Sequence, residues 1–222
     1  MKLSQETIRI LKNFSEINST ILIRRGNNIV TVDASKRILA DAKLTESLPN
    51  DFAIHDLNSL LTVSTLLDSP DFDFKNDKVI IKTNHKSVNY IYADPSVVQD
   101  AGPLRQKIPT MFNDDSVVHK FTLSEEDLKA IKQAASVMNL PYISFIGDSS
   151  GVRLVAQDIA NDTLGNFTVQ IADKCAKAFE HHLALDNLRV LPGTYDVSVS
   201  PTITHLSNKN APLEYWIVME SI

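Results

Sequence analysis

The chain has 222 residues, 43% of them hydrophobic and 22% charged, which is enough for one large domain or for two of about 110 residues with a proper core. Its net charge of −5 excludes a protein that holds DNA by positive charge spread over the whole molecule. No apolar run approaches the roughly 18 residues of a membrane-spanning helix, and the single Cys175 excludes an intramolecular disulfide and suits a reducing cytoplasm.

Residues 4–17 are predicted to form an amphipathic helix. Ser4 is a suitable N-cap, and Glu6 lies in the first turn, where the positive end of the helix dipole favours a carboxylate. Apolar residues recur at spacings of three and four on one face. The other face carries Gln5, Arg9 and Lys12.

Several strands and one further helix are predicted in the rest of the first half. Runs 21–24 and 29–32 flank Gly26, Asn27 and Asn28, which is a hairpin pattern, and more strand follows at 37–43. A strand from Phe52 leads into a helix that continues to about Leu67, with Asp56 or Asn58 as its cap and Pro70 as its stop. The remaining predicted strands are 72–74, 78–83 and 88–93.

Residues 94–117 contain three prolines and little periodicity, so we interpret them as an inter-domain connector. A helix over 124–138 follows, and then a hairpin of 142–146 and 152–159. Two strands are predicted next, at 167–171 and 178–183, followed by a short helix over 185–191 that Pro192 stops. The last three predicted strands are 195–200, 202–206 and 215–220.

The first helix is repeated 120 residues later. Residues 3–12 (LSQETIRILK) align without a gap with residues 123–132 (LSEEDLKAIK), and both segments keep the same spacing of two basic residues. We therefore predict an α+β protein of two similar domains, each with antiparallel sheets and two helices on one face. The predicted boundaries are 1–108 for the first domain, 109–118 for the end of the connector and 119–222 for the second domain.

Two apparent catalytic patterns favour ordinary structure. The sequence from Gly147 to Gly151 matches G-x-S-x-G with Ser149 in the nucleophile position, but a strand is predicted on both sides, where a nucleophile elbow needs a following helix. His181 and His182 are adjacent on a predicted strand and so point to opposite faces. We therefore expect no metal site, no cofactor and no enzymatic activity.

The basic helix faces are the remaining candidate site. Lys and Arg spaced along helices suit contacts to DNA phosphates without base readout. Two equivalent helices keep this charge although both halves are neutral to acidic, with 14 basic and 15 acidic residues in 1–115 and 8 and 12 in 116–222. The predicted DNA-facing residues are Lys2, Gln5, Arg9, Lys12, Lys129, Lys132, Gln133 and Arg189.

Several segments resemble the DNA polymerase sliding clamps of T-even-type bacteriophages over nearly the whole chain. They are MKLS at the start, Leu11–Phe14, Ile17–Ser19, Ala53–Asn58, Ala93–Ser96 and Pro192–Tyr195. The resemblance implies a ring of three chains around duplex DNA, with helices lining the hole. The family pattern has a lysine where this chain has Gln5, and Arg9, one turn along the same face, can replace that charge.

The resemblance also implies partners. These are the replicative polymerase, a clamp-loader ATPase and late transcription factors, met in the cytoplasm of an infected bacterial host. It further implies an apolar pocket for a polymerase peptide, bordered by connector and C-terminal residues. The candidate residues of this pocket are Leu104, Ile108, Met111, Phe112, Met219 and Ile222. An equally good interpretation is that they only pack the connector against the sheets.

Two other functions stay open on the sequence alone. A β-rich structural or adaptor protein of a virion would carry the basic faces incidentally. A serine hydrolase would use Ser149 and would lose its labelling by a phosphonate in Ser149→Ala.

Overall fold

The computed structural model describes residues 1–175 and 177–221, and the chain divides into two compact units, Met1–Gln106 and Lys107–Ile222. The division falls within the helix α3 (Gly102–Met111). No helix among the described residues is long and apolar enough to cross a membrane.

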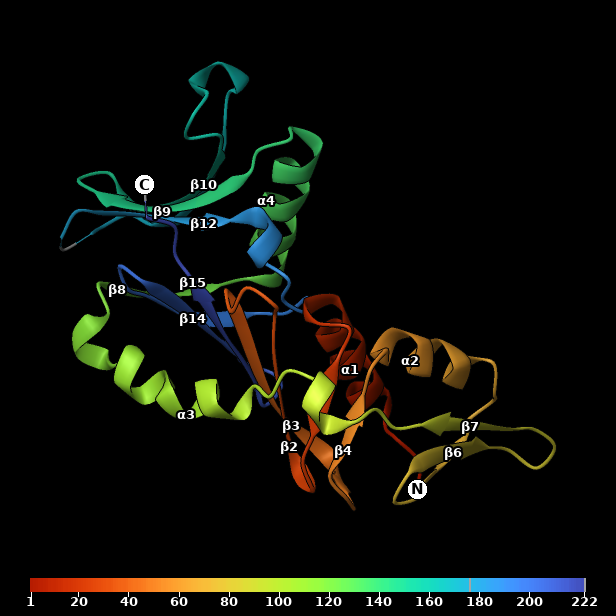
Figure 1. Ribbon diagram of the computed structural model, residues 1–222. Helices are drawn as coiled ribbons and strands as arrows, with labels where there is room; N and C mark the ends of the chain where they lie inside the picture. Colours follow the sequence, from red (N-terminus) through yellow and green to blue (C-terminus); the bar gives the residue numbers. More distant parts are fainter. Residues whose placement is uncertain (176, 222) are drawn as a thin grey trace. The chain divides into compact units, whose positions relative to one another are not determined.

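The first unit places two helices side by side over its strands (Figure 1). These are α1 (Gln5–Ile17) and α2 (Leu57–Thr65). The buried face of α1 includes Ile10, Leu11 and Phe14, which supply the apolar stripe that the sequence predicts. The strands are β1 (Ile21–Ile23), β2 (Gly26–Val32), β3 (Ile38–Leu48), β4 (Phe52–Ile54), β5 (Asp71–Phe74), β6 (Lys78–Lys82) and β7 (Ser87–Ile91).

The strands of the first unit pair antiparallel in three groups. β1 pairs with β4, β2 pairs with β3, and β5, β6 and β7 form a three-stranded meander. The predicted hairpin of 21–24 with 29–32 is therefore wrong. Gly26, at a φ of 120°, opens β2 at a register shift, while the true turn joins β2 to β3. Asp33 organises that turn, because its carboxylate accepts hydrogen bonds from the amides of Ser35, Arg37 and Ile38.

The second unit contains two antiparallel four-stranded arrangements. One has the order β15, β14, β13, β8, and the other has the order β11, β10, β9, β12. Helix α4 (Glu125–Val137) packs on β9, β10 and β11. The strands are β8 (His119–Leu123), β9 (Tyr142–Asp148), β10 (Gly151–Gln157), β11 (Phe167–Ala172), β12 (Phe179–Ala184), β13 (Tyr195–Val199), β14 (Ile203–Asn208) and β15 (Leu213–Val218).

The predicted helix over 185–191 is wrong. Leu185–Asn187 forms a single 3-10 turn, η4, in the place that α2 occupies in the first unit. The two places are equivalent because the Leu57 amide donates to the Ser19 carbonyl and the Leu185 amide donates to the Pro141 carbonyl, both at 2.8 Å. Beyond this turn the chain is held against the core, because the Leu191 amide donates to the Tyr215 hydroxyl and the Leu191 carbonyl accepts from the Tyr195 hydroxyl.

The connector is more ordered than its composition predicts. It contains α3, in which Pro103 lies in the first turn, where proline is tolerated, and Pro109 lies in the interior. Two 3-10 turns, Pro95–Val97 and Asp114–Ser116, flank this helix. The helix was not predicted from the sequence because proline is usually unfavourable within a helix.

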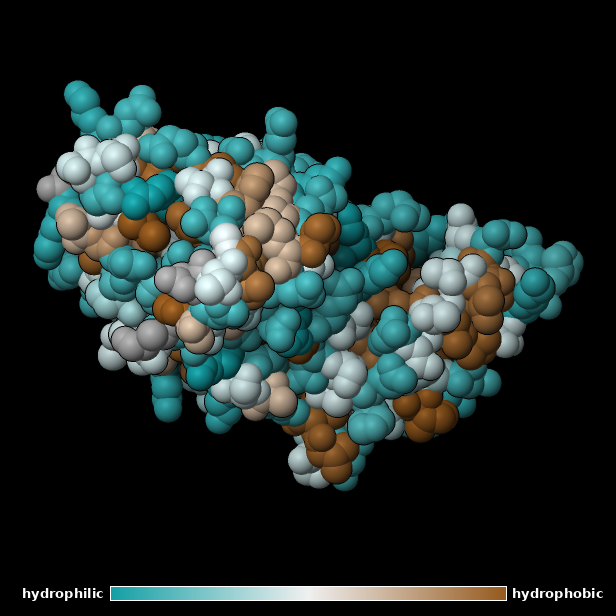
Figure 2. All heavy atoms as spheres, turned by 90° about the horizontal axis from the view of Figure 1, so that it is seen from above, coloured by the Kyte–Doolittle hydropathy of each residue, from teal (hydrophilic) through white to brown (hydrophobic). Residues whose placement is uncertain are grey.

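Large apolar side chains on the surface are few. On the face seen in Figure 2, hydrophobic atoms form separate patches on a largely hydrophilic surface. Among residues 1–175 and 177–221, the exposed large apolar residues are Met1, Leu66, Ile91, Val97, Met111, Val137 and Leu164.

Candidate nucleic-acid interface

The helix α1 presents the first predicted basic face. Ser4 caps it, with a hydroxyl that accepts from the Thr7 amide at 3.2 Å. The Glu46 carboxylate, from β3, accepts hydrogen bonds from the Ser4 amide and the Thr7 hydroxyl, so it fixes the start of the helix to the sheet. Burial raises the pKa of Glu46, but these hydrogen bonds outweigh it and hold the pKa below its usual range.

The cations of α1 lie on its exposed side. Arg9 and Lys12 are both exposed, and the Arg9 guanidinium lies 3.8 Å from the Glu6 carboxylate. Lys12 has no ion-pair partner among the described residues. Lys2 and Gln5, at the start of the same face, are exposed as well. The structure thus brings all four predicted residues of the first unit to one side of α1.

The helix α4 repeats this arrangement in the second unit. It has 13 residues, as α1 does, and its cap Ser124 accepts from the Asp127 amide at 3.1 Å. The aligned positions of Arg9 and Lys12 are Lys129, which is exposed, and Lys132, which is half-buried. Gln133 is also exposed. The repeat predicted from the sequence is therefore present down to the cap and the cationic face.

Arg189 lies beyond η4 and, like Lys2, is not on a helix. It is half-buried, and its Nε donates to the Asp186 carbonyl at 2.7 Å. The equivalent helix α2 contains no lysine or arginine, and its exposed residues are Asn58, Ser59, Thr62 and Thr65. Four of the six cations of the candidate interface therefore come from α1 and α4, and the other two are Lys2 and Arg189.

The predicted pocket residues take different environments. Ile108 is 6% exposed and Met111 is 46% exposed, and Leu104 is intermediate, all on α3. The Phe112 ring packs edge-on against His205, with centroids 5.6 Å apart. Met219 is 3% exposed and accepts at its sulfur from Thr204, 3.0 Å away. Ile222 lies outside the described residues.

The Gly147–Gly151 segment is a hairpin turn between β9 and β10, as predicted. Ser150 and Arg153 donate hydrogen bonds to the Asp148 carboxylate and lower its pKa to about 2. Ser149 is exposed in this turn. Among the described residues, no group of three or more His, Cys, Asp or Glu side chains is placed to hold a metal ion.

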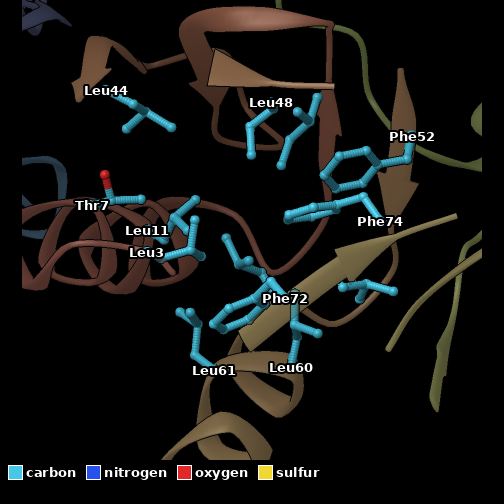
Figure 3. A pocket seen from close by; sticks show the side chains of 13 residues that line it. Leu3, Thr7, Leu11, Leu44, Leu48, Phe52, Leu60, Leu61, Phe72 and Phe74 are labelled. Atoms are coloured by element: carbon cyan, nitrogen blue, oxygen red, sulfur yellow. The ribbon is translucent and has the colours of Figure 1, made fainter. Parts of the chain in front are cut away.

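A small cavity lies beneath α1 and α2, and the side chains in Figure 3 converge on it. Its volume is about 20 Å³, close to that of a single water, and its accessible lining is entirely apolar. Such a cavity stays dry, so it is part of the core of the first unit and holds no ligand. Its lining includes Leu3, Thr7, Leu11, Phe52, Leu60 and Phe72.

The sequence of the chain is similar to those of known proteins. Residues 3–98 match the family model of DNA polymerase processivity factors. The sliding clamp of Vibrio phage KVP40 is 28% identical, and the match covers 100% of both chains. The sliding clamp of Escherichia phage RB69 is 25% identical, with 100% of this chain and 97% of the other covered.

Solved structures show the same fold at low identity. Proliferating cellular nuclear antigen from Entamoeba histolytica has a TM-score of 0.67 and 14% identity, with 96% of this chain and 94% of the other covered. PCNA from A. fulgidus, solved with the C-terminal region of FEN-1, has a TM-score of 0.69 and 12% identity, with 100% of this chain and 97% of the other covered. The chain thus has the two-domain fold of these solved structures.

Together these matches show that the chain is similar to the sliding clamps of phages over its length and, over residues 3–98, to DNA polymerase processivity factors. Its relatives are clamps of T4-like phages, including the Enterobacteria phage T4 clamp at 24% identity over 88% of this chain and 85% of the other. The resemblance to T-even-type clamps that the sequence predicted is confirmed.

Proposed function

We propose that three copies of the chain close into a ring around duplex DNA and tether the replicative DNA polymerase for processive synthesis. The observation that carries this proposal is the repeated helix, which keeps its cap and its cations in both units of a chain with a net charge of −5. A closed ring retains DNA by topology, so a few phosphate contacts without base readout suffice and still permit sliding.

Two open strand edges support ring closure. In the first unit, β7 is an edge strand and carries Ile91, which is 64% exposed. In the second unit, β11 is an edge strand with half-buried Phe167, Val169 and Ile171. The opposite edge strands, β5 and β12, already have backbone partners. The Phe72 amide of β5 donates to the Met1 carbonyl, and the Glu220 amide donates to the His182 carbonyl of β12.

Unpaired edges invite strand pairing with another chain. Pairing of β7 from one copy with β11 from the next joins unlike surfaces, and such head-to-tail contacts form a ring when the rotation closes. Three copies of a two-unit chain then give six similar units around the DNA.

The remaining partners in this proposal follow from the likeness to phage clamps. A clamp-loader ATPase opens the ring, the polymerase docks beside the connector, and late transcription factors use the same ring as a mobile activator. The site of action is the cytoplasm of the infected bacterial host.

Light scattering on a sizing column over a concentration series tests the assembly. We expect a species of three times 24.7 kDa that dissociates on dilution. A primer-extension assay with the cognate polymerase and loader then tests the function, with longer products expected when the clamp is present. A chain that stays monomeric at every concentration and leaves product length unchanged would overturn the proposal.

A further inference from the structure

A surface hollow of about 270 Å³ lies between the start of α1 and the end of α2, within the first unit. Its volume is close to the lower end of the range for ligand pockets, about 300 Å³. Lys2 and Gln5 line it from the side of α1, and Ser64, Thr65 and Ser69 line it from α2 and the segment that follows. The rest of its lining is apolar and consists of Leu3, Ile8, Leu67, Pro70 and Phe72.

Three hydrogen-bond donors of the hollow are unused. Lys2, Gln5 and Ser69 are exposed, and none of their side chains has a hydrogen-bond or ion-pair partner among the described residues. The other two hydroxyls are engaged, since Ser64 donates to the Leu61 carbonyl at 2.6 Å and Thr65 donates to the Thr62 carbonyl at 2.7 Å. One cation, one amide and one hydroxyl are thus free to donate to a ligand.

The lining favours an anion. It includes a lysine and no carboxylate. Two backbone amides at the start of α1 are already engaged, because the Ser4 amide donates to the Glu46 carboxylate and the Thr7 amide donates to the Ser4 hydroxyl. The polar side chains of the lining are of the types that contact phosphate oxygens in protein–DNA complexes.

The apolar floor adds a second requirement. Leu67 and Phe72 are 5% and 4% exposed, so the floor is a firm part of the core. A free phosphate would leave this apolar surface in water, whereas a deoxyribose next to the phosphate would cover it. The ligand that fits both parts of the hollow is an anionic group attached to a small, weakly polar ring.

We propose that this hollow seats one phosphate of the duplex backbone together with its neighbouring deoxyribose, with Lys2, Gln5 and Ser69 as donors. This inference rests on the proposed ring around DNA and deepens it, because it adds Ser69 to the predicted DNA-facing residues Lys2 and Gln5 and joins the three in one contact. It also gives Gln5 a role as a neutral phosphate donor, and it gives the α2 side of the first unit a DNA contact although α2 carries no cation.

Crosslinking tests the proposal in the full chain. Cys175→Ser removes the native thiol, and Ser69→Cys, Lys12→Cys or Asn210→Cys then provides a single one. Each variant is incubated at high concentration in a crowding agent with a duplex whose ends are blocked afterwards. The duplex carries a thiol-reactive group on a backbone phosphorothioate. Lys12 reports DNA on the α1 face, and Asn210 lies in an exposed turn of the second unit.

We expect Ser69→Cys to react as fast as Lys12→Cys and much faster than Asn210→Cys. Reaction of Lys12→Cys alone would overturn this inference and leave the ring intact. If all three react at the same slow rate, the ring around DNA fails and the inference fails with it.

A second measurement uses the lifetime of the ring on a duplex with one open end. Lys2→Gln and Ser69→Gly each remove one donor, and glycine suits the φ of 48° at position 69. We expect each change to shorten the lifetime about two- to tenfold, the equivalent of one hydrogen bond. Thr62→Val, on the exposed face of α2 outside the hollow, is the matched control and should leave the lifetime unchanged. Equal lifetimes for all variants would overturn the proposal.

Discussion

Ser4 and Ser124 begin two helices with nearly the same backbone geometry, at φ and ψ of −69° and 158° and of −69° and 156°. Each hydroxyl satisfies one of the amides that a helix leaves unpaired at its start. We expect Ser4→Ala and Ser124→Ala each to lower the free energy of unfolding by about 1 kcal/mol. Urea denaturation measures this, with Ser136→Ala, an exposed serine late in α4, as the control. A change no larger than that of the control would contradict the prediction.

Glu46 gives the attachment of α1 a pH dependence. Its pKa is lowered in the folded chain, so it contributes stability that is fully present above its unfolded value, about 4.3, and is lost as the pH falls through the folded value. Glu46→Gln removes this contribution. We therefore expect the variant to be less stable than the parent at pH 7, and the difference to shrink below about pH 4. Urea denaturation at both pH values measures the difference, and a constant difference would contradict the assignment.

At the scale of elements, the first turn of α3 is tied to the first unit by an ion pair. The Arg105 guanidinium contacts the carboxylate of Asp41 on β3, and the Asp41 side chain is only 10% exposed. Removing the arginine leaves a nearly buried carboxylate without this partner.

We expect Arg105→Ala to destabilise the chain by about 1–3 kcal/mol, the cost of leaving such a group unsatisfied. Asp41→Asn in the same chain should recover part of this loss, because the neutral amide is less costly to bury. A double-mutant cycle by thermal unfolding measures the coupling. Additive effects of the two changes would show that the pair does not anchor α3.

The basic faces of α1 and α4 are predicted to act on DNA and not on folding. We expect Lys12→Glu combined with Lys129→Glu to shorten polymerase products while the free energy of unfolding changes by no more than about 0.5 kcal/mol, the range of surface substitutions. Lys36→Glu combined with Lys43→Glu, two exposed lysines in the β2–β3 turn and on β3, makes the same change in net charge away from these helices and is the control. An equal loss of product length in the control, or an unchanged product length in the double variant, would show that these helix faces do not contact DNA.

At the scale of the whole molecule, the edge strands decide assembly. Ile91 on β7 and Val97 outside the strand are both 64% exposed, so they form a matched pair. We expect Ile91→Asp to abolish the trimer at concentrations where the parent forms it, because the carboxylate would be desolvated in the interface. Val97→Asp should still form the trimer at the same concentrations. Light scattering distinguishes them, and equal trimer formation would show that β7 is not at the interface.

The sequence determined the features that depend on neighbouring residues. The helix periodicity, the serine caps, the Asp56 cap of α2 and the hairpin at Gly147–Gly151 all follow from local hydrogen bonds and from apolar spacing. The repeat of α1 in α4 was also visible, because both helices keep the same face apolar and the same face basic.

The tertiary structure decided what depends on residues far apart in the chain. β1 pairs with β4 and not with its neighbour β2, because strand partners are chosen by distant contacts and not by a local turn pattern. The helix expected at 185–191 is a single turn, because the hydroxyls of Tyr195 and Tyr215 hold the Leu191 backbone in the core, and α3 forms despite Pro109. The hollow beside Lys2 could not be predicted, because Ser69 reaches α1 only after the chain has folded through 60 intervening residues or more.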